Sequence, residues 1–142
     1  LGQIQTMQQQ MRKMKKWKPI VKYNSKFLNR IGIFFMIGGI SIFPFVVLRE
    51  TYLQDNKFWT KRRAKTINHE TIHYQQQLEM LVIPFYLVYF LEYLIRFLIS
   101  FDGHKAYRGI SFEQEAYNNE HNLEYLKTRK RYNWLRLMFK SI

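Results

Sequence analysis

The stretch His69-Glu70-Thr71-Ile72-His73 sets two histidines four residues apart, with a glutamate directly after the first. On an α-helix, positions four apart differ by about 40° around the axis, so both imidazoles point to one side. Two histidine nitrogens at this spacing suit a tetrahedral Zn²⁺ ion. Glu70 lies about 60° from His73 on the same side, where a carboxylate can take a proton from water. The stretch predicts a metal site with Glu70 as general base.

The flanking sequence predicts a helix from about Lys61 to Met80, so the two histidines fall within it. The helical setting matters because successive residues of a strand face opposite sides. On a strand, Glu70 would point away from both histidines. The proposed chemistry therefore requires a helix here.

A catalytic zinc ion also needs a third protein ligand and one open position. The remaining histidines are His104 and His121, and the plausible carboxylates are Glu113 and Glu115 in residues 111–117, SFEQEAY. On a helix these two glutamates lie about 200° apart, so only one can face the metal. Both flank the apolar face about equally, and periodicity alone leaves both open.

Two segments together resemble a known family: residues 69–76, HETIHYQQ, and residues 112–117, FEQEAY. They are similar to gluzincin metallopeptidases, especially the minigluzincins and the HtpX-type membrane enzymes, and to small bacterial zincin-like proteins. In the HtpX-type pattern the ligand glutamate stands three residues before the Ala of an Ala-Asp pair. Glu113 matches that position, whereas Tyr117 replaces the Asp. The resemblance, which covers about residues 38–125, implies Glu113 as third ligand, with Glu115 as the alternative.

The resemblance implies an α+β, mainly helical zincin-like domain, which we place at residues 27–142. The basic run at residues 12–18, followed by Pro19, predicts that residues 1–26 form an arm before this domain. The resemblance also implies Zn²⁺ as cofactor and peptide-bond hydrolysis as activity. Residues 38–48 would form a strand beside the cleft, and an extended substrate could add to the edge at residues 40–47 through backbone hydrogen bonds.

An anionic reaction intermediate usually needs one further hydrogen-bond donor. Five side chains are candidates on sequence grounds: His104, Tyr107, Arg108, Tyr117 and His121. The sequence does not choose among them.

The composition favours a membrane surface. The net charge of +13 indicates anionic partners, either phospholipid headgroups or nucleic acid. No recognisable nucleic-acid-binding module is present, so an anionic lipid surface is the better interpretation. Aromatic residues form 18% of the chain, as suits a membrane interface. The absence of cysteine excludes disulfides and thiolate metal ligands.

Two long apolar runs, residues 31–48 and 81–101, bear on membrane topology. As a helix the second would be about 31 Å long, enough to cross a bilayer core, with Glu92 and Arg96 one turn apart neutralising each other. The first contains Gly and Pro and suits a strand equally well. Lys and Arg are spread evenly around the two runs, so we expect at least one run not to span.

Two functions follow as hypotheses. The first is a membrane-associated zinc metallopeptidase that cuts a peptide or protein near the lipid surface. The second is a non-catalytic subunit of a larger membrane protein complex that keeps the zincin-like scaffold.

Overall fold

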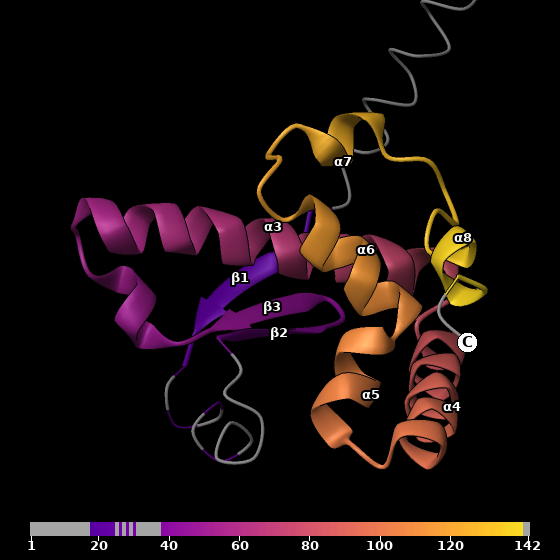
Figure 1. Cartoon of the computed structure of the whole chain (residues 1–142). Helices are drawn as coiled ribbons and strands as arrows, with labels where there is room; N and C mark the ends of the chain where they lie inside the picture. Colours follow the sequence, from indigo (N-terminus) through magenta and orange to yellow (C-terminus); the bar gives the residue numbers. More distant parts are fainter. Residues whose placement is uncertain (1–17, 25, 27, 29, 31–37, 141–142) are drawn as a thin grey trace, which may run out of the picture.

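A computed structural model describes residues 18–24, 26, 28, 30 and 38–140 (Figure 1). Its elements are β1 (Ile20–Tyr23), β2 (Gly39–Ile42), β3 (Phe45–Leu48), the 3₁₀ helix η1 (Glu50–Leu53), α3 (Lys57–Glu79), α4 (Ile83–Ser100), α5 (Gly103–Gly109), α6 (Ser111–Asn119), α7 (Tyr125–Thr128) and α8 (Leu135–Met138). The chain is α+β and mainly helical, which confirms the predicted class.

The sheet has the strand order β1-β3-β2. β2 and β3 form an antiparallel hairpin in which Ser41 pairs with Val46, so the predicted strand region at 38–48 is two strands around Pro44. β3 is central, and the expected edge at residues 40–47 is therefore limited to β2. Val46 and Leu48 point into the core that the sheet shares with Tyr52.

β1 was not expected, because it lies within the segment assigned to the basic arm. Residues 20–23 pair in parallel with β3, Val21 opposite Val46. Four residues of the segment assigned to the arm thus belong to the sheet. A four-residue strand shows too little alternation to be recognised in sequence, and its pairing depends on a distant strand. Residues 1–17 of the predicted arm lie outside the described residues.

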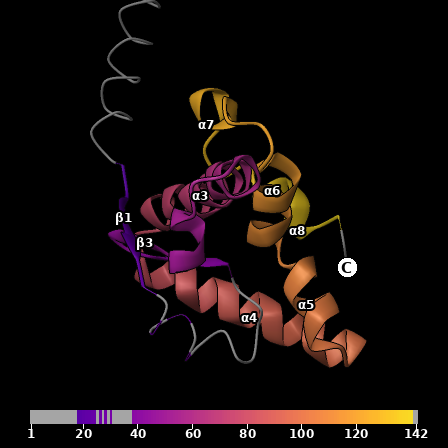
Figure 2. The same cartoon turned by 90° about the vertical axis from the view of Figure 1, so that its left-hand side faces the viewer.

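Helix α3 lies between the sheet and α6 (Figure 2). It begins at Lys57, four residues earlier than expected, because the Asn56 side chain accepts a hydrogen bond from the Trp59 amide and caps the helix. All its buried residues come from Asn68 onward, so its first half projects beyond the core. It ends before Leu81 and Val82. Their φ values of 60° and 61° are positive, and a right-handed helix requires negative φ values.

Helix α4 packs mainly on α5. Its Glu92–Arg96 pair also anchors the start of α6. Glu92 Oε1 accepts hydrogen bonds from Arg96 Nη2 at 2.7 Å and the Ser111 amide at 2.8 Å. The Ser111 hydroxyl donates to Glu92 Oε2 at 2.7 Å. α6 thus begins at Ser111 and ends at Asn119, whereas the sequence favours a helix from Phe112 to Arg131 with Ser111 as its N-cap.

Within the described residues, α4 is the one helix long and apolar enough to cross a membrane. Only 17% of its span is buried in the protein. The exposed side chains are largely apolar, and they include Ile83, Leu87, Phe90, Leu91, Leu94, Ile95, Leu98 and Ile99. The protein therefore presents one large apolar helical surface to its surroundings.

Candidate metal centre

Three side chains of the sequence-predicted site meet between α3 and α6. His69 Nε2 lies 3.4 Å from Glu113 Oε2, and His73 Nε2 lies 3.2 Å from Glu113 Oε1. The two Nε2 atoms are 3.1 Å apart. All three side chains are buried, and their potential ligand atoms lie within 4.8 Å of one another. The group could hold a metal ion.

Glu120 fixes the orientation of the first histidine. Its Oε2 lies 2.9 Å from His69 Nδ1. An ionised carboxylate only accepts hydrogen bonds, so Nδ1 carries the proton and, in a neutral ring, Nε2 presents its lone pair to the centre. Carboxylate support of this kind orients metal-binding histidines. Glu120 lies seven residues after Glu113, a two-turn spacing that would place both on one helix face but does not by itself pair Glu120 with His69.

Gln76 fixes the orientation of the second histidine, His73. Its side-chain NH₂ group donates to the Phe112 carbonyl at 3.2 Å and to Glu115 Oε2 at 2.9 Å. Both contacts orient the amide so that its Oε1 faces His73 Nδ1, 2.8 Å away. His73 Nδ1 must therefore donate, which leaves His73 Nε2 with a lone pair for the centre.

These contacts fit a cation. Two imidazole lone pairs and a carboxylate converge, and the buried Glu113 Oε2 has the His69 Nε2 atom 3.4 Å away but no well-aligned hydrogen bond among the described residues. Its other oxygen, Oε1, accepts from the Tyr89 hydroxyl at 2.7 Å. Electron-rich atoms brought this close repel unless a metal ion or a proton lies between them.

The neighbouring charges shift the pKa values of all three side chains. Burial lowers the pKa of His69, but hydrogen bonds to Glu113 and Glu120 outweigh it and raise the value to about 10. Burial also lowers the pKa of His73, and the Glu113 charge more than reverses this. Burial raises the pKa of Glu113, yet the His73 charge and the histidine hydrogen bonds bring it well below the ordinary value. A metal ion therefore competes with protons here.

Glu70 lies beside the ligands without being one of the three. Burial, together with the nearby Glu113 charge, raises its pKa, while the two histidines oppose the rise. The backbone amide of Ser41 donates a hydrogen bond to its carboxylate. Gly39 permits the close approach of strand and helix, because a Cβ there would lie 3.2 Å from Glu70 Cγ. Glu70 thus sits between the edge strand and the three side chains that could hold a metal ion.

Glu115, the alternative third ligand, points away from the histidines. Its Oε1 accepts from Arg129 Nε at 2.7 Å and from the Tyr125 hydroxyl at 2.7 Å. Arg129 also pairs with Glu79, and all three charged side chains are at most 6% exposed. Glu115 therefore belongs to a buried ion network next to the centre, on the other side of α6 from Glu113.

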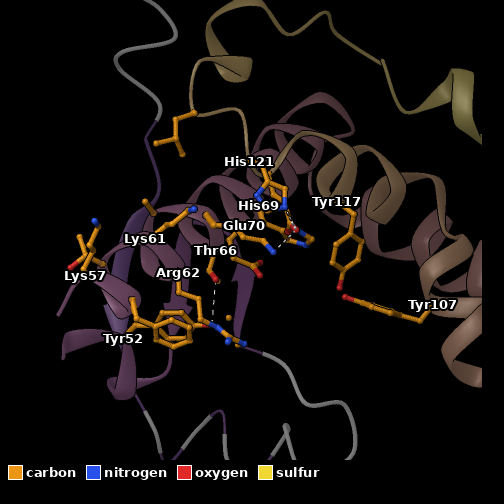
Figure 3. Close-up of a pocket in the computed structure, with 18 residues that line it drawn as sticks. Tyr52, Lys57, Lys61, Arg62, Thr66, His69, Glu70, Tyr107, Tyr117 and His121 are labelled. Carbon is orange, nitrogen blue, oxygen red and sulfur yellow. Dashed lines mark hydrogen bonds and ion pairs between the residues drawn. The ribbon is translucent and has the colours of Figure 1, made fainter. Parts of the chain in front are cut away.

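The five candidate hydrogen-bond donors to an anionic intermediate differ in exposure and in position. His104 is exposed on α5, and His121 is exposed at the cavity mouth. The Arg108 guanidinium stacks over the Tyr117 ring, 3.7 Å from its centroid. Tyr117 packs against His69, with ring centroids 4.6 Å apart. The hydroxyls of Tyr107 and Tyr117 point toward each other (Figure 3).

Two cavities meet at Glu70, which lines both of them together with Gly39, His69 and Tyr107. The larger, about 940 Å³, runs along the first half of α3 and is lined by His69, Tyr107 and Tyr117 (Figure 3). The smaller, about 260 Å³, lies between β2 and α4. An extended chain that occupied both would pass the metal ligands and Glu70.

Much of the outer edge of β2 is already hydrogen-bonded. The Ser41 carbonyl accepts from Gln77 Nε2 at 3.0 Å and from the Tyr86 hydroxyl at 3.3 Å. The Phe43 amide donates to Gln77 Oε1 at 3.2 Å. A substrate backbone could pair there only near Gly39 without displacing these side chains. The expected strand addition is therefore restricted to one end of β2.

Comparisons with known proteins found no matching family model, no matching curated protein and no matching solved structure. The resemblance to gluzincins rests on residues 69–76 and 112–117, whose His69, His73 and Glu113 side chains lie together in one buried centre.

Proposed function

We propose that this protein is a membrane-associated zinc metallopeptidase. The observation that carries the proposal is the orientation of both histidines by Glu120 and Gln76, each of which accepts from a histidine Nδ1 atom. Both Nε2 atoms are left facing Glu113, with Glu70 alongside. Purely structural histidines would not need this arrangement.

The donor set suits Zn²⁺. His69, His73 and Glu113 would hold it, since two histidines and one glutamate form a familiar catalytic zinc set that leaves one position open. When bound, zinc lowers the pKa of water from 15.7 to about 7 and polarises a carbonyl oxygen. The chain contains no cysteine, so no thiolate competes for the ion.

Glu70 is the proton carrier in this proposal. Its carboxylate accepts a proton from the attacking water as oxygen adds to the peptide carbonyl carbon. The same proton then passes to the leaving nitrogen, and the C–N bond breaks to give a carboxylic acid and an amine. Burial raises the pKa of Glu70, which makes its carboxylate a stronger base than an exposed one.

Tyr107 and Tyr117 are the proposed hydrogen-bond donors to the developing negative charge. Burial and the Glu113 charge raise the pKa of Tyr107, so its hydroxyl keeps its proton at neutral pH. Both residues line the larger cavity. A protonated phenol beside a water-poor centre is an effective donor to an oxyanion.

The exposed apolar surface of α4 supports membrane association. Its side chains are up to 71% exposed at Ile83 and 65% exposed at Leu87. The opposite face carries the Glu92–Arg96 pair, turned toward α5 and α6. The helix would therefore lie with one face in lipid and the other on the protein, and the net charge of +13 suits an anionic surface.

The same surface favours one alternative, a non-catalytic subunit of a larger membrane complex whose partner helices cover α4. The two functions are separated by comparing wild type, Glu70→Gln and chelator-treated protein on peptides bound to vesicles. Glu124→Gln is the matched control, because that glutamate is exposed and remote from the centre. A peptidase loses cleavage with Glu70→Gln and chelation only. Zinc-loaded wild type without cleavage would favour the subunit.

A further inference from the structure

The larger cavity has a cationic end. Its lining includes Lys57, Lys61, Arg62 and Lys65, all on the first half of α3, against two carboxylates, Glu70 and Glu120. Glu120 is already bound to Lys65, 2.9 Å away, and to His69. The remaining three cations are not neutralised by the cavity itself.

These three cations are available to a ligand. Lys57 and Lys61 form no ion pair with a carboxylate of the described residues. The Arg62 guanidinium lies over the rings of Phe58 and Trp59, with its central carbon 5.6 Å and 5.8 Å from their centroids. Stacking holds that side chain in place but leaves its N–H groups free to bind a carboxylate.

Helix geometry gives their distance from the reacting centre. Arg62 precedes His69 by seven residues, which places it about 20° away around the axis and about 10 Å along it. Lys61 is one residue farther, at about 12 Å. An extended peptide advances about 3.3 Å per residue. The two cations are therefore level with the third or fourth residue from a scissile bond at the centre.

The other side of the centre differs in character. The smaller cavity is lined by Ile40, Phe85, Tyr86 and Tyr89 among others, so it suits an apolar side chain. A ligand that crossed Glu70 would meet aromatic walls on one side and cations on the other.

The cationic end also faces away from the apolar surface. α4 lies at the C-terminal end of α3, whereas Lys57 and Lys61 lie at the opposite end of that helix (Figure 1). With α4 in lipid, an anion would reach the cavity from water rather than from a headgroup. This arrangement favours an acidic peptide over an anionic lipid.

We propose that the site selects peptides with an apolar residue beside the scissile bond on one side and acidic residues at the third and fourth positions on the other. Lys61 and Arg62 bind the acidic side chains. This inference rests on the proposed peptidase function and names its substrate class.

The test measures binding in zinc-loaded Glu70→Gln protein, which does not depend on cleavage. Fluorescence anisotropy compares three peptides that are identical except for Glu, Gln or Lys at the third and fourth positions from the scissile bond. The set is made twice, with these positions on the N-terminal or on the C-terminal side of that bond. We expect the Glu peptide to bind at least tenfold more tightly than the Gln peptide at low salt, and the Lys peptide most weakly.

Substitutions of the two cations test their role, and a variant with the same change in net charge elsewhere is the control. Lys61→Glu/Arg62→Glu should abolish the preference for the Glu peptide, and the milder Lys61→Gln/Arg62→Gln should reduce it. Lys105→Glu/Lys130→Glu, which changes net charge equally at exposed positions elsewhere, should retain it. Circular dichroism confirms that each variant is folded.

Equal binding of the Glu and Gln peptides, or equal loss in both charge-reversed variants, would overturn the proposal. Vesicles of anionic lipid whose binding depends on Lys61 and Arg62, without any peptide preference, would also overturn it and assign the cations to headgroups. Failure of the peptidase function is a separate result: the Glu peptide would then bind selectively, while wild type cleaved none of the three.

Discussion

Gln76 donates a hydrogen bond to Glu115 Oε2 across 2.9 Å, and this contact ties the metal centre to the ion network outside it. Glu115 is held by Arg129, which also binds Glu79. The orientation of His73 therefore depends on charges that never touch the metal ligands.

Gln76→Leu should weaken zinc binding about 10- to 100-fold, as expected when the group that orients a ligand histidine is lost. The change removes the acceptor for His73 Nδ1 and keeps similar volume. Competition with a chromophoric chelator measures the affinity. Gln75→Leu, the same change at a partly exposed neighbour, should leave it unaltered. Similar affinity in both variants would show that Gln76 does not position His73.

Arg129→Met should destabilise the fold by about 3–5 kcal/mol, because it leaves Glu79 and Glu115 buried without their cation. Thermal unfolding followed by circular dichroism provides the measurement. Arg131→Met, at an exposed position, serves as control and should change stability little. Matching losses in the two variants would contradict a structural role for the buried network.

The stability of the metal-free protein should fall as pH rises from about 6.5 towards 10. The folded protein raises the pKa of His69 from 6.5 to about 10, so the contribution of its proton is fully present below 6.5 and is lost as pH rises through 10. Zinc should reverse this trend, because its binding displaces protons and strengthens with pH. Unfolding temperatures with and without zinc across this range are the readout; parallel curves would refute the prediction.

Leu91→Glu/Leu98→Glu should remove much of the protein's affinity for anionic vesicles, since both side chains lie on the exposed face of α4 at 55% and 56% exposure. Co-sedimentation with vesicles measures binding. Leu53→Glu/Leu123→Glu replaces leucines of similar exposure, 51% and 56%, outside α4, and should bind much more like wild type. A wild-type protein that remains monodisperse in water without detergent or vesicles would argue against a lipid-facing α4.

Tyr107→Phe should lower kcat by about 10²–10³-fold with little change in KM, the effect expected when one donor to an oxyanion is lost. The phenyl ring keeps its packing, so stability should change little. Tyr23→Phe, on the remote strand β1, is the matched control. A change in KM alone would assign Tyr107 to substrate binding instead.

Features that depend on the spacing of residues within one helix could be predicted from the sequence. The spacing of His69 and His73 required a helix, and a helix is present. The geometry of α6 allowed only one of Glu113 and Glu115 to face the histidines, and the structure places Glu113 there. The choice itself came from the resemblance, because both glutamates flank the apolar face of α6 equally.

The missed features depend on contacts between distant residues. Glu120 supports His69 from 51 positions away, and β1 is a strand only because β3 pairs with it. Arg129 and Glu79 are 50 positions apart and appear in sequence as ordinary charged residues. No periodicity within a short window reports such pairs, since their proximity results from the packing of whole elements.

The hydrogen bond from Tyr89 to Glu113 has a further consequence. Tyr89 belongs to α4, whose neighbouring Phe90 points outward and is 64% exposed. Adjacent residues of one rigid helix would thus contact a metal ligand and the lipid. If the proposed function holds, this contact would keep the centre at a fixed height above the bilayer, so that only peptide bonds at that height could be cut. A substrate peptide bond just outside the membrane would then be within reach of the centre. The same substrate sequence farther from the membrane would not be cut.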